Sequence, residues 1–171
     1  MNSSKIGFGG GCHYCTEAVF QSLIGVEKVE QGYVASTGEN SNFSEAVIVH
    51  FNPEEILLQT LIEIHLYTHK STSDHSMRDK YRSAVYTFSG MQKQESITVI
   101  MELKIKFDNQ LTTKVLPFEC FKPSREQITN YYYSNPKKPF CEAFINPKLK
   151  YLLHKFSEYV NHEKFIQAVK I

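Results

Sequence analysis

The sequence lacks long apolar runs, an excess of charge of either sign, and any tryptophan. No stretch approaches the roughly 18 consecutive apolar residues that a membrane-spanning helix needs, so we expect no association with a membrane. The 19 Lys and Arg residues nearly balance the 18 Asp and Glu residues, and the formal net charge of +1 provides no field to attract nucleic acid. The first residues also lack the apolar centre of a signal peptide, so we expect a cytoplasmic location.

Cysteine is scarce as well, with 4 residues in a chain of 171. Cytoplasmic thiols stay reduced, so these cysteines do not indicate a disulfide framework. Cys12 and Cys15 form a Cys-x-x-Cys pair, whereas Cys120 and Cys141 stand far apart in the sequence. A structural zinc site needs a second close pair of ligands, so we expect no metal. The pair indicates redox or nucleophilic chemistry, with inert packing as the plainer alternative.

The rest of the composition is typical of one globular domain. Hydrophobic residues make up 42 % of the chain and charged residues 22 %, and the length is sufficient to bury a core without disulfides or metals. The sequence has no repeat, linker or low-complexity segment. We expect a single catalytic domain over residues 1–160, a polar carboxy-terminal tail over residues 161–171, and a monomer.

Apolar periodicity and turn signals predict the order strand, helix, strand, strand, helix, strand, followed mainly by helices. A long polar segment, residues 68–80, is typical of a functional surface loop. The order predicts an α+β fold: a two-layer sandwich with a ferredoxin-like split β-α-β core and added C-terminal helices. The predicted strands are residues 5–8, 26–35, 46–51, 81–87 and 112–118, and the predicted helices are 16–23, 53–67, 92–106, 124–133 and 148–159.

Cys12 ends a run of three glycines, at the point where the first predicted helix begins. Glycine lets the backbone adopt positive φ and approach a ligand closely. The first amides of a helix lack partners, and the helix dipole places roughly half a positive charge there, which stabilises an anion. A thiol in this position loses its proton readily. We therefore expect Cys12 to be a nucleophile, with Cys15 one turn further on as a disulfide partner.

Several separated motifs resemble the A-type peptide methionine sulfoxide reductases, which reduce the S epimer of methionine sulfoxide. The family signature is Gly-Cys-Phe-Trp, sometimes followed by Cys, with a glutamate five positions after the first Cys. Here the corresponding residues are Gly11-Cys12-His13-Tyr14-Cys15 and Glu17. Further matches follow in the family's order over most of residues 5–141: Gly25-Val26, Gly32-Tyr33, Ser44-Glu45-Ala46-Val47, Asn52-Pro53-Glu54, Tyr81-Arg82-Ser83-Ala84-Val85-Tyr86, Pro117-Phe118, residues 132–136, and Cys141.

The resemblance implies catalytic roles for three residues. Cys12 would attack the sulfoxide sulfur, Glu45 would give a proton to the departing oxygen, and the Tyr81 hydroxyl would help to bind that oxygen. A carboxyl group can serve as this acid at neutral pH only if burial favours its protonated form. The Cys12 sulfenic acid would condense with a nearby thiol, and a dithiol such as thioredoxin would reduce the disulfide. No cofactor is implied, and the activity would repair free or protein-bound methionine sulfoxide under oxidative stress.

The substrate pocket departs from the family pattern. His13 and Tyr14 stand where the family has the Phe-Trp pair that grips the S-methyl group. Tyr14 can still supply an aromatic wall, whereas His13 is polar and can be charged in mild acid. The family also has a second catalytic tyrosine in a longer loop, but no tyrosine lies between Tyr33 and Glu45. Phe43 or Tyr14 could occupy that space.

Two further family features have no clear counterpart. The family's aspartate before Tyr-Arg-Ser falls at Ser76 by ungapped counting, with Asp74 and Asp79 as the nearest carboxylates. The resolving cysteine is also open: Cys15 is closest in sequence, and Cys141 roughly matches a family recycling cysteine. The fourth cysteine is expected to be packed.

Two other functions compete with the reductase. A catalytically impaired family member could bind sulfoxide peptides without reducing them, because the pocket pair, the loop and the aspartate are altered. A general thiol-disulfide oxidoreductase could use Cys12 and Cys15 on protein disulfides.

Overall fold

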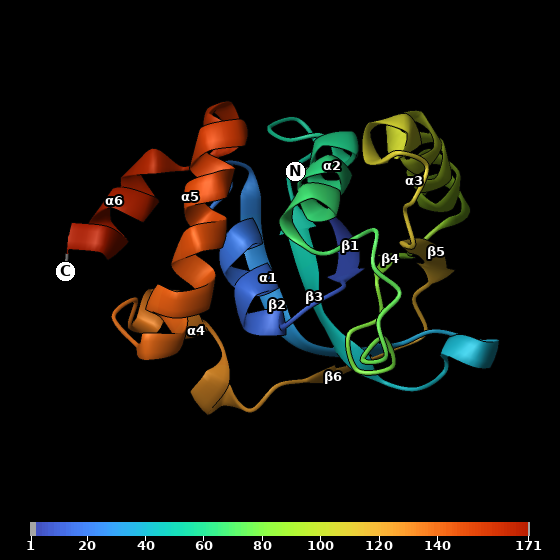
Figure 1. Cartoon of the computed structure of the whole chain (residues 1–171), viewed down its shortest axis with the longest axis horizontal. Helices are drawn as coiled ribbons and strands as arrows, with labels where there is room; N and C mark the ends of the chain where they lie inside the picture. Colours follow the sequence, from blue (N-terminus) through green and yellow to red (C-terminus); the bar gives the residue numbers. More distant parts are fainter. Residues whose placement is uncertain (1–2, 171) are drawn as a thin grey trace.

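The computed structural model describes residues 3–170, with side chains up to residue 167 (Figure 1). One mixed sheet has the strand order β5-β4-β1-β3-β2-β6. All neighbouring strands are antiparallel except β4 and β5, which are parallel. The strands are β1 (Ser4–Gly9), β2 (Val26–Ala35), β3 (Ser44–Phe51), β4 (Ala84–Thr87), β5 (Lys114–Pro117) and β6 (Cys120–Pro123).

Within residues 3–170, six α-helices accompany the sheet, and α1 and α2 supply the two crossovers of the central four strands. The inner order β4-β1-β3-β2 is that of a split β-α-β unit, so the predicted α+β class and ferredoxin-like core are confirmed. Helices α1 and α2 lie over one face, with α5 against both of them and α3 against α2 (Figure 1). The helices are α1 (His13–Gln21), α2 (Leu58–Thr68), α3 (Gly90–Leu103), α4 (Tyr131–Ser134), α5 (Asn146–Lys155) and α6 (His162–Lys170).

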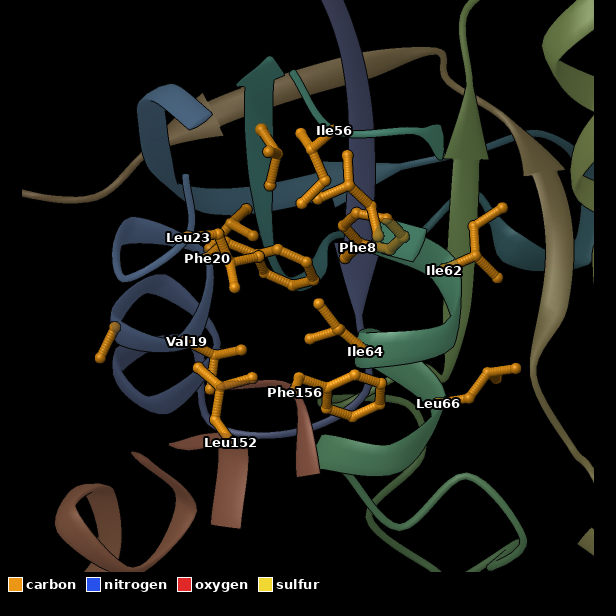
Figure 2. Packing of buried hydrophobic residues seen from close by; sticks show 14 of the residues in the cluster. Phe8, Val19, Phe20, Leu23, Ile56, Ile62, Ile64, Leu66, Leu152 and Phe156 are labelled. Carbon is orange, nitrogen blue, oxygen red and sulfur yellow. The ribbon is translucent and has the colours of Figure 1, made fainter. Parts of the chain in front are cut away.

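The main core lies between the sheet and these helices. Alternate residues of β1 and β3 point towards the helices, as the two-residue period of a strand requires. Phe8 of β1 stacks on Phe20 of α1 with 4.6 Å between ring centroids, and Leu152 and Phe156 close the core at the α5 side (Figure 2). A smaller cluster on the opposite face contains Val34, Ala46, Ile48, Ala84 and Tyr86.

Sheet register brings the glycine turn to the start of β3. Gly9 at the end of β1 pairs with Ala46, and Glu45 pairs with Tyr33 on β2. The chain leaves β1 at Gly9 and enters α1 four residues later. The amino terminus of α1 therefore lies beside Glu45.

Several predicted boundaries are wrong for local reasons. The helix predicted from residue 53 begins only at Leu58, because Asn52 closes a turn in which its side-chain oxygen accepts from the Glu54 amide at 3.0 Å. The strand predicted from Tyr81 begins only at Ala84, since the Arg82 amide donates to the Ser44 hydroxyl at 2.7 Å instead of to a neighbouring strand.

The carboxy-terminal third differs most from the prediction. Strand β6 was not predicted, and Cys120 lies exposed on this edge strand, so the expectation that it is packed is wrong. The helix predicted over residues 124–133 is two short pieces separated by Asn130, whose φ of 52° is left-handed. A π-helical turn precedes α5, and most of the predicted polar tail is helix α6. Within the described chain, no helix combines the length and apolarity needed to cross a membrane.

Candidate active site

Cys12 caps the amino terminus of α1, directly after the glycine turn. Gly10 in that turn has φ of 153°, and a Cβ added there would collide with Cδ2 of His69. The neighbouring Gly11 meets no atom within 4 Å of such a Cβ. The close approach of the turn to His69 therefore requires glycine at position 10 and explains part of the glycine run.

The surroundings of Cys12 favour its thiolate. A side-chain hydrogen bond from Cys15 is the largest cause that lowers the pKa of Cys12, and the backbone amides of Tyr14 and Cys15 act in the same direction. Burial and the carboxylate of Glu45 oppose the shift without cancelling it. The first-turn amides act as predicted, and the thiol of Cys15 adds a donor.

Glu45 is buried at the start of β3 and faces the same helix terminus. Its Oε1 accepts from the His13 amide at 3.1 Å and lies 3.5 Å from His13 Nε2. Its Oε2 lies 3.7 Å from the ammonium of Lys80, and its own amide donates to the Lys80 carbonyl at 2.9 Å. The predicted acid and the predicted nucleophile are therefore neighbours, and sequence analysis missed the lysine beside them.

Tyr81 contacts Lys80, which in turn contacts this carboxylate. The Lys80 ammonium is 5.1 Å from the centre of the Tyr81 ring, and a hydrogen bond with the Tyr81 side chain is the largest cause that raises the pKa of Lys80. Tyr81 sits in the loop before β4, and its amide donates to the Met77 carbonyl at 3.0 Å. Cys12, Glu45 and Tyr81 thus come from three separate elements to one region.

Arg78 fixes the loop that carries Lys80 and Tyr81. Its guanidinium donates to the carbonyls of Gly10 at 3.0 Å and of Tyr81 at 2.8 Å, and also to those of Ser73 and Lys70. The three residues considered as replacements for the family aspartate, Asp74, Ser76 and Asp79, are all exposed. An arginine therefore ties this loop to the glycine turn, a role that its sequence position alone did not indicate.

Aromatic rings form a wall beside Cys12. Tyr14 stacks on Tyr131 with 4.2 Å between centroids and an angle of 15°, and Phe140 meets both rings edge-on. Tyr33 and Tyr14 flank the buried ring of His13, with centroids 5.3 and 5.1 Å away. Phe43, the other predicted pocket residue, is 45 % exposed on the loop before β3.

Glu17 explains why the signature carries a glutamate at this position. The side chain is buried, and its carboxylate accepts from the amides of Asn130 at 2.8 Å and Tyr131 at 3.1 Å, and from Gln31 Nε2 at 3.0 Å. Burial raises the pKa of Glu17, while these hydrogen bonds lower it. Glu17 therefore joins α1 to α4 and holds Tyr131 against Tyr14.

Three of the four cysteines gather at this end of α1. Cys15 and Cys141 are buried, and the Cys141 thiol donates to the Asn135 carbonyl at 3.6 Å. The hydrogen bond with Cys12 and burial raise the pKa of Cys15, and Cys141 is near enough to add to that effect. Lys148 of α5 is half-buried and donates to the Thr68 carbonyl at 2.5 Å, and its charge acts on Cys15 and Cys12.

The site offers thiols and carboxylates but no metal-binding arrangement. Among the residues that the structure describes, no group of three or more His, Cys, Asp or Glu side chains could hold a metal ion. Behind the glycine turn, the buried His65 stacks on the half-buried His69 with 4.1 Å between ring centroids, and His69 Nε2 lies 2.7 Å from the Ser83 hydroxyl oxygen.

Comparison with known proteins gives a consistent result. A family model described as peptide methionine sulfoxide reductase matches residues 4–160. The MsrA proteins of Acinetobacter baumannii (strain SDF) and Deinococcus radiodurans are 32 % and 33 % identical, over 87 % and 88 % of this chain and 93 % and 81 % of their own.

Solved structures resemble the fold at lower identity. Reduced Mxr1 from Saccharomyces cerevisiae has a TM-score of 0.72 at 23 % identity, over 81 % of this chain and 89 % of its own. Methionine sulfoxide reductase A of Corynebacterium diphtheriae has a TM-score of 0.69 at 21 % identity, over 80 % and 76 %. Mxr1 was also solved in complex with Trx2, with a TM-score of 0.62 at 22 % identity, over 73 % and 83 %. With the family model and the MsrA relatives in agreement, the chain belongs to the peptide methionine sulfoxide reductase family.

Proposed function

We propose that this protein reduces the S epimer of methionine sulfoxide, free or in proteins, to methionine. The observation that carries the proposal is the pairing of two groups at one helix terminus. The Cys12 pKa is lowered by the Cys15 thiol and by first-turn amides, and the Glu45 carboxylate accepts from the His13 amide next to it at 3.1 Å. A nucleophile and a proton donor are the two groups that sulfoxide reduction requires.

The first step transfers oxygen to Cys12. The thiolate attacks the sulfoxide sulfur, and Glu45 gives its proton to the oxygen, which ends on Cys12 as a sulfenic acid when the sulfur-oxygen bond of the substrate breaks. The substrate sulfur gains the two electrons that the Cys12 sulfur loses, and methionine leaves. Tyr81 would bind the oxygen, and the wall of Tyr14, Tyr131 and Phe140 would receive the S-methyl group.

A second thiol then resolves the sulfenic acid. We propose Cys15 for this step, because its thiol already makes a side-chain hydrogen bond with Cys12. The Cys15 sulfur bonds to the Cys12 sulfur, and the hydroxyl of the sulfenic acid leaves as water with the thiol proton. Cys141, which is close enough to act electrostatically on Cys15, is the alternative partner or the next in a relay.

An external dithiol completes the cycle by supplying two electrons and two protons to the disulfide. We propose a thioredoxin-type reductant, by analogy with the Mxr1 complex with Trx2. We also propose a monomer in the cytoplasm that repairs oxidised methionine under oxidative stress. One chain supplies every group named at the site, and a reducing compartment suits a thiol mechanism. Size-exclusion chromatography with light scattering tests the monomer.

A dithiothreitol-driven assay on both epimers of a blocked methionine sulfoxide tests the activity. The wild type should form methionine from the S epimer only, and one turnover without reductant should consume two thiols. Cys12→Ser should abolish turnover, and Glu45→Gln should lower it about 100-fold or more while Cys12 still alkylates. Peptide binding that survives Cys12→Ser without any methionine formed would instead support an inactive binding protein.

One observation also favours a second candidate function. The hydrogen-bonded pair of Cys12 and Cys15 is typical of general thiol-disulfide oxidoreductases. That function predicts reduction of insulin disulfides, lost equally in Cys12→Ser and Cys15→Ser, with no preference for a sulfoxide epimer.

A further inference from the structure

His13 makes contacts that set its ring orientation and its tautomer. The ring is buried, and Nδ1 lies 2.9 Å from the carbonyl oxygen of Gly32 on β2. A carbonyl oxygen only accepts hydrogen bonds, so Nδ1 must carry a proton in either charge state of the ring. The remaining nitrogen, Nε2, therefore faces Glu45 with a lone pair when the ring is neutral and with a proton when it is charged.

The second nitrogen of His13 faces the carboxylate of Glu45, where the two groups could share a proton. Nε2 of His13 lies 3.5 Å from Oε1 of Glu45, near hydrogen-bonding distance, and the His13 amide donates to the same oxygen. A neutral ring beside an ionised carboxylate would set two lone pairs against each other. A single shared proton removes that repulsion, either as a carboxylic acid beside a neutral ring or as a carboxylate beside an imidazolium.

Other charged and titratable groups surround the pair from each neighbouring element. Lys80, from the loop before β4, approaches Oε2 of Glu45 rather than Oε1, so it leaves the contact with His13 free. The groups that face the pair are Glu17, Tyr14 and Cys12 at α1, Tyr33 on β2, and Lys80.

We propose that His13 is a proton-relay residue for Glu45. This inference rests on the proposed reductase function and deepens it. When the Cys12 thiolate takes oxygen from the substrate, the single proton of the pair passes from Nε2 of His13 to Glu45 and from Glu45 to that oxygen. Glu45 is then a carboxylate and the His13 ring is neutral. In the reductive step a dithiol proton that Cys12 releases on forming its thiolate recharges the ring, so protons balance over the cycle.

The relay gives a reason for a histidine at a position where the family resemblance has phenylalanine. The family uses a second tyrosine that this chain lacks between Tyr33 and Glu45. A histidine changes charge between about pH 5 and 8, so it can keep the acid supplied with protons at neutral pH. His13 acts through Glu45 and is a positioning residue, not a group that touches the substrate.

Two matched variants and the pH profile of kcat/KM for the S epimer test the relay. His13→Asn places an amide nitrogen where Nδ1 donates to Gly32 but has no atom at Nε2, and His13→Gln places an amide near Glu45 that cannot titrate. Both should lower kcat about 10- to 100-fold at pH 8, within the usual range of general acid-base catalysis, and change it less than about 3-fold at pH 5.5. The alkaline limb of the profile should move to lower pH by about one unit or more.

The Cys12 alkylation rate is the control and should stay the same in both variants, since the thiolate donors are untouched. An unchanged pH profile with only a change in KM would overturn the relay and leave His13 as a packing residue. If the wild type does not reduce the S epimer at all, the proposed function itself is wrong.

The tautomer of His13 can be measured on the wild type, without any substitution of His13. Long-range nitrogen-15 NMR spectra of the imidazole should show the Nδ1-protonated tautomer above the titration of His13, and Glu45→Gln should shift that titration. The Nε2-protonated tautomer, or a titration that is indifferent to Glu45→Gln, would overturn the shared proton.

Discussion

Replacing Cys15 separates its effect on the Cys12 thiolate from its proposed role in resolving the sulfenic acid. The side-chain hydrogen bond from Cys15 is the largest cause of the lowered Cys12 pKa. Cys15→Ala removes that donor, and Cys15→Ser keeps a hydroxyl donor at the same position. A hydrogen bond to a charged group contributes about 1.5 kcal/mol at the low end of the usual range, which suits a weak thiol donor. That energy corresponds to about one pKa unit.

The assay is the rate of Cys12 alkylation by iodoacetamide against pH, with mass spectrometry to separate this cysteine from Cys120 and Cys141. Below the Cys12 pKa, Cys15→Ala should alkylate about tenfold more slowly than the wild type, because the thiolate fraction falls by that factor. Cys15→Ser should stay within about threefold of the wild type. Equal rates in Cys15→Ala and the wild type would refute the argument, because the amides of the helix terminus would then account for the whole shift.

The same two variants test the resolving step. With thioredoxin as reductant, neither should turn over more than once if Cys15 resolves the sulfenic acid, whereas Cys141→Ser should still cycle. Sustained turnover in Cys15→Ser, lost in Cys141→Ser, would assign the step to Cys141. Circular dichroism controls for the small core cavity that Cys15→Ala leaves in a buried position.

Three further substitutions test the supports of the site. Gly10→Ala should lower stability by about 1–3 kcal/mol in urea unfolding and reduce activity, because a Cβ would meet His69, whereas Gly11→Ala should be nearly neutral in open space. Glu17→Gln should lower the free energy of unfolding by about 1–3 kcal/mol, because the new side-chain amide nitrogen would face the Asn130 amide, which is also a donor. Burial raises the pKa of Glu17 in the folded protein, so its contribution to stability is present below the pKa of the unfolded chain and is lost as the pH rises through the folded-state pKa. The difference in the free energy of unfolding between the wild type and Glu17→Gln should therefore narrow from pH 4 to 7. A difference that widens over this range would contradict the argument. Arg78→Lys should lower the free energy of unfolding by about 2 kcal/mol and should also lower kcat, because one ammonium cannot reach four carbonyls. Unchanged kcat and stability would show that the loop does not need these hydrogen bonds.

Local patterns predicted the parts of the fold that depend on local chemistry. The strand of residues 26–35 was predicted with the bounds that β2 has, since its ends are marked by Gly25 and a polar loop. The glycine run and the helix after Cys12 gave the thiolate site, because backbone freedom and a helix terminus are properties of neighbouring residues. The helix start predicted after Asn52 is wrong, because a capping side chain followed by a proline is compatible with a single turn as well as with a helix.

Contacts between residues on different strands could not be predicted from such local patterns. The pairing of Glu45 with Tyr33, and hence its approach to α1, depends on the register of β2 and β3. Arg78 is one basic residue in a polar loop until the fold brings four carbonyls around it. Strand β6 was not predicted, because its four residues at a sheet edge show no clear alternation and end in Pro123, a residue type that is rare within sheets.

Two basic side chains contact one carboxylate of the site, which argues against random decay of the site. His13 replaces a phenylalanine of the family pattern and contacts Oε1 of Glu45, and Lys80 contacts Oε2. An inactive relative would have no reason to place two basic side chains on the acid while keeping the lowered pKa of Cys12 beside it. The oxygen that leaves the substrate takes up a proton, so a working acid at this site needs a source of protons. The relay through His13 supplies that source, and it explains why a polar ring occupies a position that the family gives to a hydrophobic one.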